Sequence, residues 1–100
     1  VLHGASSVIP KYVDIINANG GQLKDAIGVP EDQLRQAAKL AVCKINIDSD
    51  LRLAMTAGVR QQLIADPANF DPRSYLKVGQ YVKDLVKDKI VNVLGSDNKL

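Results

Sequence analysis

The sequence predicts an α/β fold in which two parallel strands are joined and followed by helices. Short apolar segments at residues 1–3 and 42–47 are typical of strands, and helical patterns occupy the residues between and after them. Two strands that are connected through helices pair in parallel by a right-handed crossover. Because parallel strands need cover on both faces and neighbours at both edges, we expect the 100 residues to form the rim of a larger core.

The first half contains both predicted strands and two of the helices. Val1 and Leu2 run directly into a turn of small residues. We therefore expect them to be the end of a buried strand, and the sequence to be a fragment of a longer protein. A helix is predicted at residues 9–17, where Pro10 lies near the first turn and its missing N–H costs least. A second helix is predicted at residues 30–41, because carboxylates in its first turn complement the helix dipole.

The second half is predicted to be helical. A helix at residues 51–65 has an apolar stripe at spacings of four residues, and Met55 on it is interpreted as a core residue. A longer helix at residues 71–94 ends at Gly95. The stripes are Leu51, Met55, Val59 and Leu63 in the first helix, and Leu76, Val82, Leu85, Val86, Ile90 and Val93 in the second. Three lysines of the second helix are expected to face solvent, namely Lys83, Lys87 and Lys89.

Composition limits the class of protein. The net charge of +2 is too small to argue for a nucleic-acid or membrane partner, and we expect neither. Cys43 is the only cysteine, which excludes an internal disulfide, and its apolar surroundings favour a buried, inert thiol. No apolar run reaches transmembrane length and no signal peptide is visible, so a cytoplasmic location is the default expectation.

Small polar clusters follow both predicted strands, at residues 3–7 and 46–50. Function gathers at the carboxyl ends of parallel strands, so we expect the two clusters to face one pocket. In the first, the backbone and hydroxyl groups of Gly4 and Ser6 suit a phosphate, although a tight turn without a ligand explains them equally well. His3 suits zinc or a purely structural hydrogen bond, and catalytic zinc wants about three protein ligands, which this single histidine cannot supply.

The second cluster also allows two interpretations. Asp48 or Ser49 would be suitable caps for the following helix. Alternatively, Asn46 and Asp48, two residues apart on an extended strand end, point together into the pocket, and Ser49 helps to bind an anion.

Three motifs in register make the chain similar to class II fructose-bisphosphate aldolases. Residues 1–8 resemble the strand-seven segment of that family, and residues 44–50 resemble its strand-eight signature, usually Asn-Ile-Asp-Thr-Asp. Residues 70–76 resemble its Asp-Pro-Arg element, and residues 28–31 also fit. The resemblance implies a (β/α)8 TIM barrel, of which residues 1–50 would be strand seven to strand eight and residues 51–100 the C-terminal helices.

The resemblance also implies roles for seven residues. His3 matches the last of three zinc-binding histidines, and zinc in this family polarises the ketone and stabilises an enediolate. The other six residues match positions that contact the substrate. The C1 phosphate is bound at the positions of Gly4, Ser6, Asp48 and Ser49, and Asn46 matches a residue that contacts the dihydroxyacetone-phosphate carbons. Arg73 matches an arginine that reaches the C6 phosphate, in some members from a neighbouring subunit. No catalytic acid or base of the family matches a residue of this chain. Whether a monovalent cation binds in addition to the zinc is not determined by the sequence.

The expected activity is reversible cleavage of fructose 1,6-bisphosphate in glycolysis and gluconeogenesis, once the chain is assembled with the missing N-terminal part. A homo-oligomer, dimer or tetramer, is expected. Tagatose-bisphosphate aldolase shares the strand-seven motif and is the nearest alternative, and a helical module that binds phosphate without chemistry is an alternative of another class. Two positions depart from the family pattern, Ser49 for the commoner Thr and Ala5 for Gly.

Overall fold

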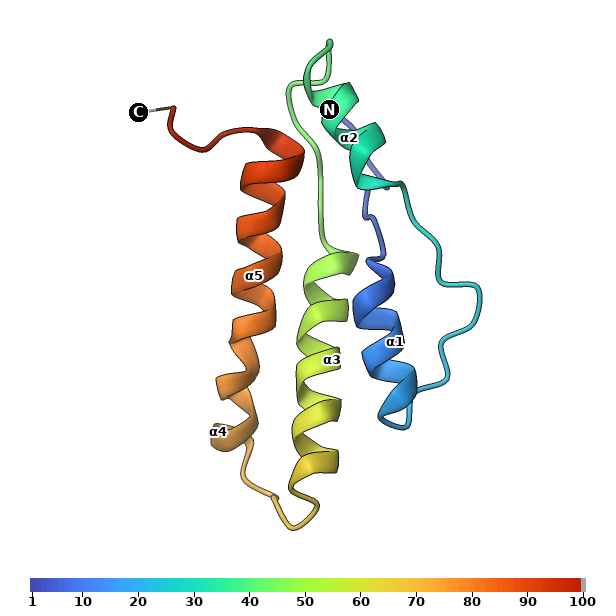
Figure 1. The fold of residues 1–100 in the computed structure, drawn as a ribbon, viewed down its shortest axis with the longest axis vertical. Coiled ribbons are helices and arrows are strands. Elements are labelled where there is room, and N and C mark those ends of the chain that lie inside the picture. The colour runs from blue at the N-terminus through green and yellow to red at the C-terminus, as the bar shows by residue number, and fades with distance from the viewer. Residues whose placement is uncertain (100) are drawn as a thin grey trace.

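The computed structural model describes residues 1–99 as one layer of helices. The helices α1 (Pro10–Ala18) and α3 (Ser49–Ala65) lie side by side with a long C-terminal helical segment, and α2 (Glu31–Ala38) lies near the chain start (Figure 1). The layer extends 50 × 34 × 17 Å.

The C-terminal segment follows the prediction in extent but not in regularity. Residues 71–94 were predicted as one helix, and Figure 1 shows one continuous column. It consists of four successive segments of different geometry: α4 (Pro72–Tyr75), the 3₁₀ helix η1 (Leu76–Gly79), α5 (Gln80–Asp88) and the π-helix η2 (Lys89–Leu94). Asp71 caps the beginning by accepting a 3.0 Å hydrogen bond from the Arg73 N–H, and Gly95 ends it as predicted.

The two predicted strands are reduced to a single contact, which corrects the prediction of an α/β chain. No strand is present within residues 1–99, and residues 1–3 and 42–47 meet only in an isolated bridge between Leu2 and Ile45. The bridge is parallel, as predicted, with Leu2 N–H donating to the Lys44 carbonyl at 2.8 Å and Asn46 N–H to the Leu2 carbonyl at 3.0 Å. The physical reason is that a parallel pair without neighbouring strands has nothing to extend its ladder.

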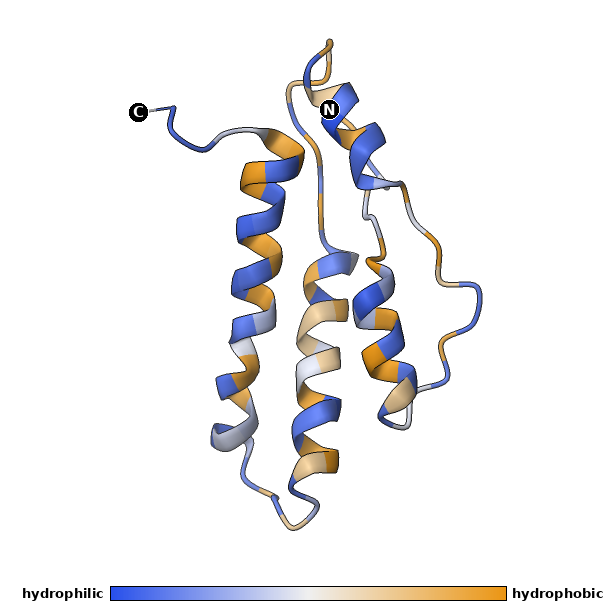
Figure 2. Ribbon diagram, viewed as in Figure 1, coloured by the Kyte–Doolittle hydropathy of each residue, from blue (hydrophilic) through white to orange (hydrophobic). Residues whose placement is uncertain are grey.

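Two small cores hold the layer together. Tyr12 and Ile16 of α1 pack with Ala54 and Ala57 of α3 and with Leu85. At the end where the chain begins, a second cluster unites Ala5, Leu34 and Val93. Apolar and hydrophilic residues alternate along each helix, so every helix presents only one stripe to these cores (Figure 2).

The buried face of α3 differs from the predicted one. Instead of the large stripe through Met55, the side that faces its neighbours carries Ala54, Ala57 and Gly58, while Leu63 is 38 % exposed and Met55 half-buried. The reason is that small residues let the axes of neighbouring helices approach closely. Cys43 was predicted to be buried and is exposed, because the segment around it pairs only at Ile45. Among residues 1–99, no helix is long and apolar enough to cross a membrane.

Candidate functional site

The parallel bridge brings the two polar clusters together. Leu2 pairs with Ile45, and the next residues along each segment, His3 and Asn46, approach until Asn46 Nδ2 lies 2.8 Å from His3 Nδ1. Four residues further on, the Ser7 N–H donates to the Asp50 carboxylate at 2.8 Å. The two clusters thus contact each other directly, and that they face one pocket stays a prediction.

The His3–Asn46 contact determines which ring nitrogen is available. If Asn46 Nδ2 donates, Nδ1 of His3 accepts and the neutral ring carries its proton on Nε2. Turning the amide by 180° presents Oδ1 to an Nδ1–H and leaves Nε2 able to bind a metal, an orientation typical of metal-binding histidines. His3 is exposed, so it fits the role of one ligand. Within residues 1–99, no three His, Cys, Asp or Glu side chains gather closely enough to hold a metal ion.

The turn after His3 is held in an unusual backbone shape. Gly4 has φ 62° and Val8 has φ 50°, which is a strained value for a β-branched residue. The Val29 N–H donates to the Ser6 carbonyl at 3.1 Å, and Gly28 lies so close that an added Cβ would overlap the backbone of Ser6. The strain at Val8 therefore persists only because neighbouring segments fix the turn.

A buried charge cluster supports this turn, and it was not predicted. Asp50 is fully buried, and its carboxylate accepts hydrogen bonds from the N–H groups of Ser7 and Val8 at 2.8 and 2.7 Å. Lys89, only 4 % exposed, lies 3.2 Å from the same carboxylate and donates to Ser7 Oγ at 2.9 Å. We call Ser7, Val8, Asp50 and Lys89 the Asp50–Lys89 cluster.

The prediction that Lys89 faces solvent is wrong, and the sequence contains the signal that would have corrected it. Leu85, Lys89 and Val93 follow one another at spacings of four, so the lysine lies on the stripe of the two buried apolar residues. The prediction followed the charge of the lysine side chain and disregarded its position on this stripe. The buried lysine is stable there because the Asp50 carboxylate balances its charge and Ser7 Oγ accepts a hydrogen bond from it.

The first turn of α3 places Asp48 and Ser49 at the surface. Asp48 occupies the N-cap position, but no side chain makes a capping hydrogen bond, so the capping interpretation is not supported. Instead, both side chains meet Arg52, whose Nη2 lies 3.0 Å from Asp48 Oδ2 and 3.3 Å from Ser49 Oγ. The Arg52–Asp48 pair is largely exposed, and such pairs stabilise a protein little.

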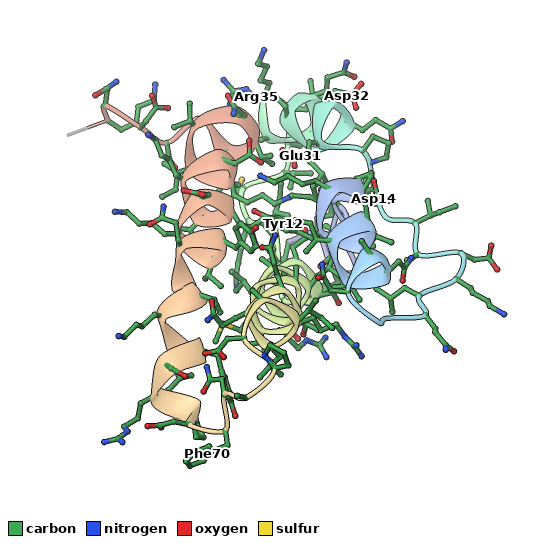
Figure 3. The ribbon with its side chains drawn as sticks, turned by 60° about the horizontal axis from the view of Figure 1, so that its bottom comes forward. Tyr12, Asp14, Glu31, Asp32, Arg35 and Phe70 are labelled. Carbon is green, nitrogen blue, oxygen red and sulfur yellow. The ribbon has the colours of Figure 1, made fainter. Side chains whose placement is uncertain are left out.

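Arg73 lies away from the other predicted site residues. It belongs to α4, which follows the far end of α3, whereas Ser49 begins α3. The 17 residues of α3, which lie between them in the chain, span ~24 Å along the helix axis. Phe70, 90 % exposed, marks this far end in Figure 3. The guanidinium is 87 % exposed and contacts Asp71 through Nε and Nη2, which lowers the pKa of that carboxyl.

Glu31 of α2 and Asp88 of α5 lie beside the Asp50–Lys89 cluster. Lys89 Nζ lies 3.7 Å from Glu31 Oε1. Burial raises the pKa of Glu31, a hydrogen bond with Asp88 raises it further, and the charge of Lys89 opposes both. Figure 3 shows Glu31 at the start of α2 with Tyr12 nearby. Burial, followed by the charges of Asp84 and Asp88, raises the pKa of Tyr12.

Comparisons with known proteins agree with the motifs. The profile of the family described as fructose-bisphosphate aldolase class-II matches residues 1–99. A fructose-bisphosphate aldolase of Treponema pallidum is 55 % identical over 97 residues, which cover 96 % of this chain and 29 % of that protein. A class 2 fructose-bisphosphate aldolase of Synechocystis is 43 % identical over 89 % of this chain and 25 % of its own length. A fructose-bisphosphate aldolase of Giardia intestinalis is 48 % identical over 80 % of this chain and 25 % of its own length.

The chain therefore spans between a quarter and a third of the length of these curated relatives. The family profile nevertheless covers almost all of the chain, including both polar clusters and the Asp-Pro-Arg element. The fold of this family is a TIM barrel, in which two adjacent parallel segments carrying polar turns are expected at the same end. This chain belongs to the class II fructose-bisphosphate aldolase family.

Proposed function

We propose that this chain is the C-terminal part of a metal-dependent fructose-bisphosphate aldolase that cleaves fructose 1,6-bisphosphate reversibly to dihydroxyacetone phosphate and glyceraldehyde 3-phosphate. The observation that carries the proposal is the 2.8 Å contact between His3 and Asn46, one from each signature segment, next to the parallel bridge. A barrel enzyme needs such adjacency, because its site is built from the ends of several strands. The reaction would serve glycolysis and gluconeogenesis in the cytoplasm.

The residues of this chain would bind the metal and hold one end of the substrate. His3 would supply one ligand to a zinc ion, which polarises the substrate carbonyl when bound. The turn at Gly4 and Ser6 and the hydroxyl of Ser49 would surround the C1 phosphate, since backbone N–H and hydroxyl groups donate to anions. Asn46 would contact the dihydroxyacetone-phosphate carbons, and Asp48 the far side of the phosphate site.

Two features support assembly with further polypeptide. The chain has one histidine, whereas a catalytic zinc takes about three protein ligands, and the relatives are more than three times longer. The remaining ligands would come from the N-terminal part of the same protein. Arg73 would reach the C6 phosphate of a substrate bound in a neighbouring subunit of a homo-oligomer, which agrees with its place beyond the end of α3 that lies opposite Ser49.

The test uses the full-length protein that carries this chain. Cleavage of fructose 1,6-bisphosphate is followed by a coupled assay with and without a chelator, and bound zinc is measured for the wild type and for His3→Ala. We expect the chelator to abolish cleavage, added zinc to restore it, and His3→Ala to lose both zinc and activity. Asn17→Ala, at the other end of α1, is the control and should retain both. Full activity of His3→Ala, or cleavage that the chelator leaves unchanged, would refute the proposal, and faster cleavage of tagatose 1,6-bisphosphate would reassign the substrate.

A further inference from the structure

The Asp50–Lys89 cluster joins three parts of the chain at one point. Asp50 lies in the first turn of α3, Ser7 and Val8 lie in the turn after His3, and Lys89 begins η2. The Lys89–Ser7 hydrogen bond spans 82 positions of sequence, and the Asp50 contacts span 43 and 42. Each buried side-chain polar atom among residues 1–99 has a partner, so the cluster is fully satisfied.

The cluster holds the end of the turn whose earlier residues, Gly4 and Ser6, the proposed function assigns to phosphate. Asp50 binds two consecutive N–H groups, those of Ser7 and Val8, and thereby holds the strained φ of Val8. Without this bidentate contact, Val8 would return to an ordinary backbone region and the turn that contains Gly4 and Ser6 would change shape. A carboxylate that accepts two N–H bonds is a strong and directional anchor.

Lys89 keeps Asp50 in this position. A buried carboxylate needs a compensating charge, and Nζ of Lys89 supplies it at 3.2 Å while its second contact fixes Ser7 Oγ. The helix widens into π geometry from Lys89 onward, and such turns are frequent at functional sites. Ser7 is thus held by the cluster and is 8 % exposed, whereas its neighbour Ser6 is half-buried.

We propose that Lys89 is a positioning residue of the aldolase: acting through Asp50 and Ser7, it holds the Gly4–Val8 turn in the shape that binds the substrate's phosphate. The inference rests on the proposed function for the location of the phosphate. Lys89 does not touch the substrate, and it acts on binding because it determines where the N–H groups and the Ser6 hydroxyl of the turn point.

The experiment compares Lys89→Met, Lys89→Arg and the matched control Lys87→Met in the full-length enzyme. Lys87 is an exposed lysine of α5, two residues before Lys89. The readouts are kcat, KM for fructose 1,6-bisphosphate, the inhibition constant of inorganic phosphate, and hydrogen exchange of the Ser7 and Val8 amides. For Lys89→Met we expect an inhibition constant and KM raised about tenfold, equivalent to about 1.4 kcal/mol, faster exchange at both amides, and unchanged zinc content.

Lys89→Arg should recover most of the phosphate affinity because it keeps the charge, and Lys87→Met should equal the wild type. If Lys89→Met does not fold, the double variant Asp50→Asn/Lys89→Met removes both charges and should show the same loss of phosphate affinity. Unchanged phosphate inhibition in the folded variants overturns the inference, even where exchange is faster, because the cluster would then support the fold alone.

Failure of the proposed function gives a different result. A wild-type protein without aldolase turnover that still binds inorganic phosphate, measured by calorimetry, refutes the activity, and the same variants then test the inference by binding alone. A wild-type protein that binds no inorganic phosphate overturns the inference itself.

Discussion

The contact between α3 and the C-terminal segment predicts opposite effects for the same substitution at two glycines. Gly58 is buried in α3, and a Cβ built on it would lie 2.8 Å from Val78 Cβ and 3.3 Å from Tyr81 Cδ2. Real Cβ atoms do not approach so closely, and Val78 Cβ is tied to the backbone of η1, so that turn must move. Gly79 ends η1, and a Cβ there would meet no atom within 4 Å.

The magnitudes follow from two competing effects. Overpacking costs about 1–3 kcal/mol, whereas replacing glycine by alanine in a helix gains about 1 kcal/mol. We therefore expect Gly58→Ala to lower the free energy of unfolding by up to roughly 2 kcal/mol. Gly79→Ala, which is free of overlap, should raise it by about 0.4–1 kcal/mol.

The assay is urea denaturation of the full-length protein with each variant, followed by circular dichroism and by tyrosine fluorescence so that the two transitions can be compared. The two variants should differ by roughly 2 kcal/mol, with the wild type between them. Gly58→Ala that is as stable as Gly79→Ala would refute the close approach of α3 and η1.

Three further predictions concern Tyr12, Glu31 and Arg73. Tyr12→Phe removes the 3.2 Å hydrogen bond to the Tyr81 carbonyl and should cost about 1 kcal/mol at pH 7. Because the folded state raises the pKa of Tyr12 above 10.0, the wild type should lose stability as pH rises through that folded pKa, and a melting series from pH 8 to 11 should show a smaller loss in the variant. Because the folded state raises the pKa of Glu31, the protonated form that stabilises the protein is lost as pH rises through the folded pKa. Glu31→Gln should therefore raise the melting temperature at pH 7 relative to the wild type, and this difference should shrink at pH 4. Equal differences at the two pH values would contradict the burial of that carboxyl. Arg73→Lys should raise KM for the bisphosphate with kcat nearly unchanged, because lysine cannot form the bidentate contact with a phosphate, and unchanged kinetics would remove Arg73 from the site.

The helices could be predicted from local patterns, because each signal lies within the helix itself. Pro10 marks the first turn of α1, and the structure begins that helix at this residue. Gly95, with φ 64°, ends the C-terminal segment where the sequence predicted. The parallel direction of the pairing was also predictable, because connection through helices permits little else.

The extent of the strands and the content of the core could not be predicted in the same way. A ladder depends on neighbouring strands, and local composition at residues 42–47 carries no information about them. Large apolar residues on α3 suggested the buried stripe, yet the close approach of helices selected Ala54, Ala57 and Gly58. The burial of Lys89 was not predicted for a related reason. Its partner Asp50 is remote in sequence, and only the fold brings the two charges together so that the cost of burying the lysine is offset.

For the candidate site, the sequence predicted that the two polar segments lie next to each other, but it did not predict which side chains contact one another there. The sequence places His3 and Asn46 at equivalent ends of two parallel segments, and the structure brings them to 2.8 Å. Nothing local indicates that Asp48 and Ser49 would meet Arg52, or that Ser7 rather than Ser6 would be held by Lys89. The roles of these residues in binding remain predictions that the experiments above test.

The long sequence separations within the Asp50–Lys89 cluster have a consequence for the order of folding. Its bond from Lys89 to Ser7 closes a loop of 82 residues, and such a closure is costly until other contacts have shortened the effective loop. We therefore expect the helices α1 and α3 and the bridge at Leu2 to form before the lysine reaches its partners. Mutations in the cluster should then accelerate unfolding while leaving the folding rate nearly unchanged, so that this buried pair governs how long the native protein survives rather than how quickly it is made.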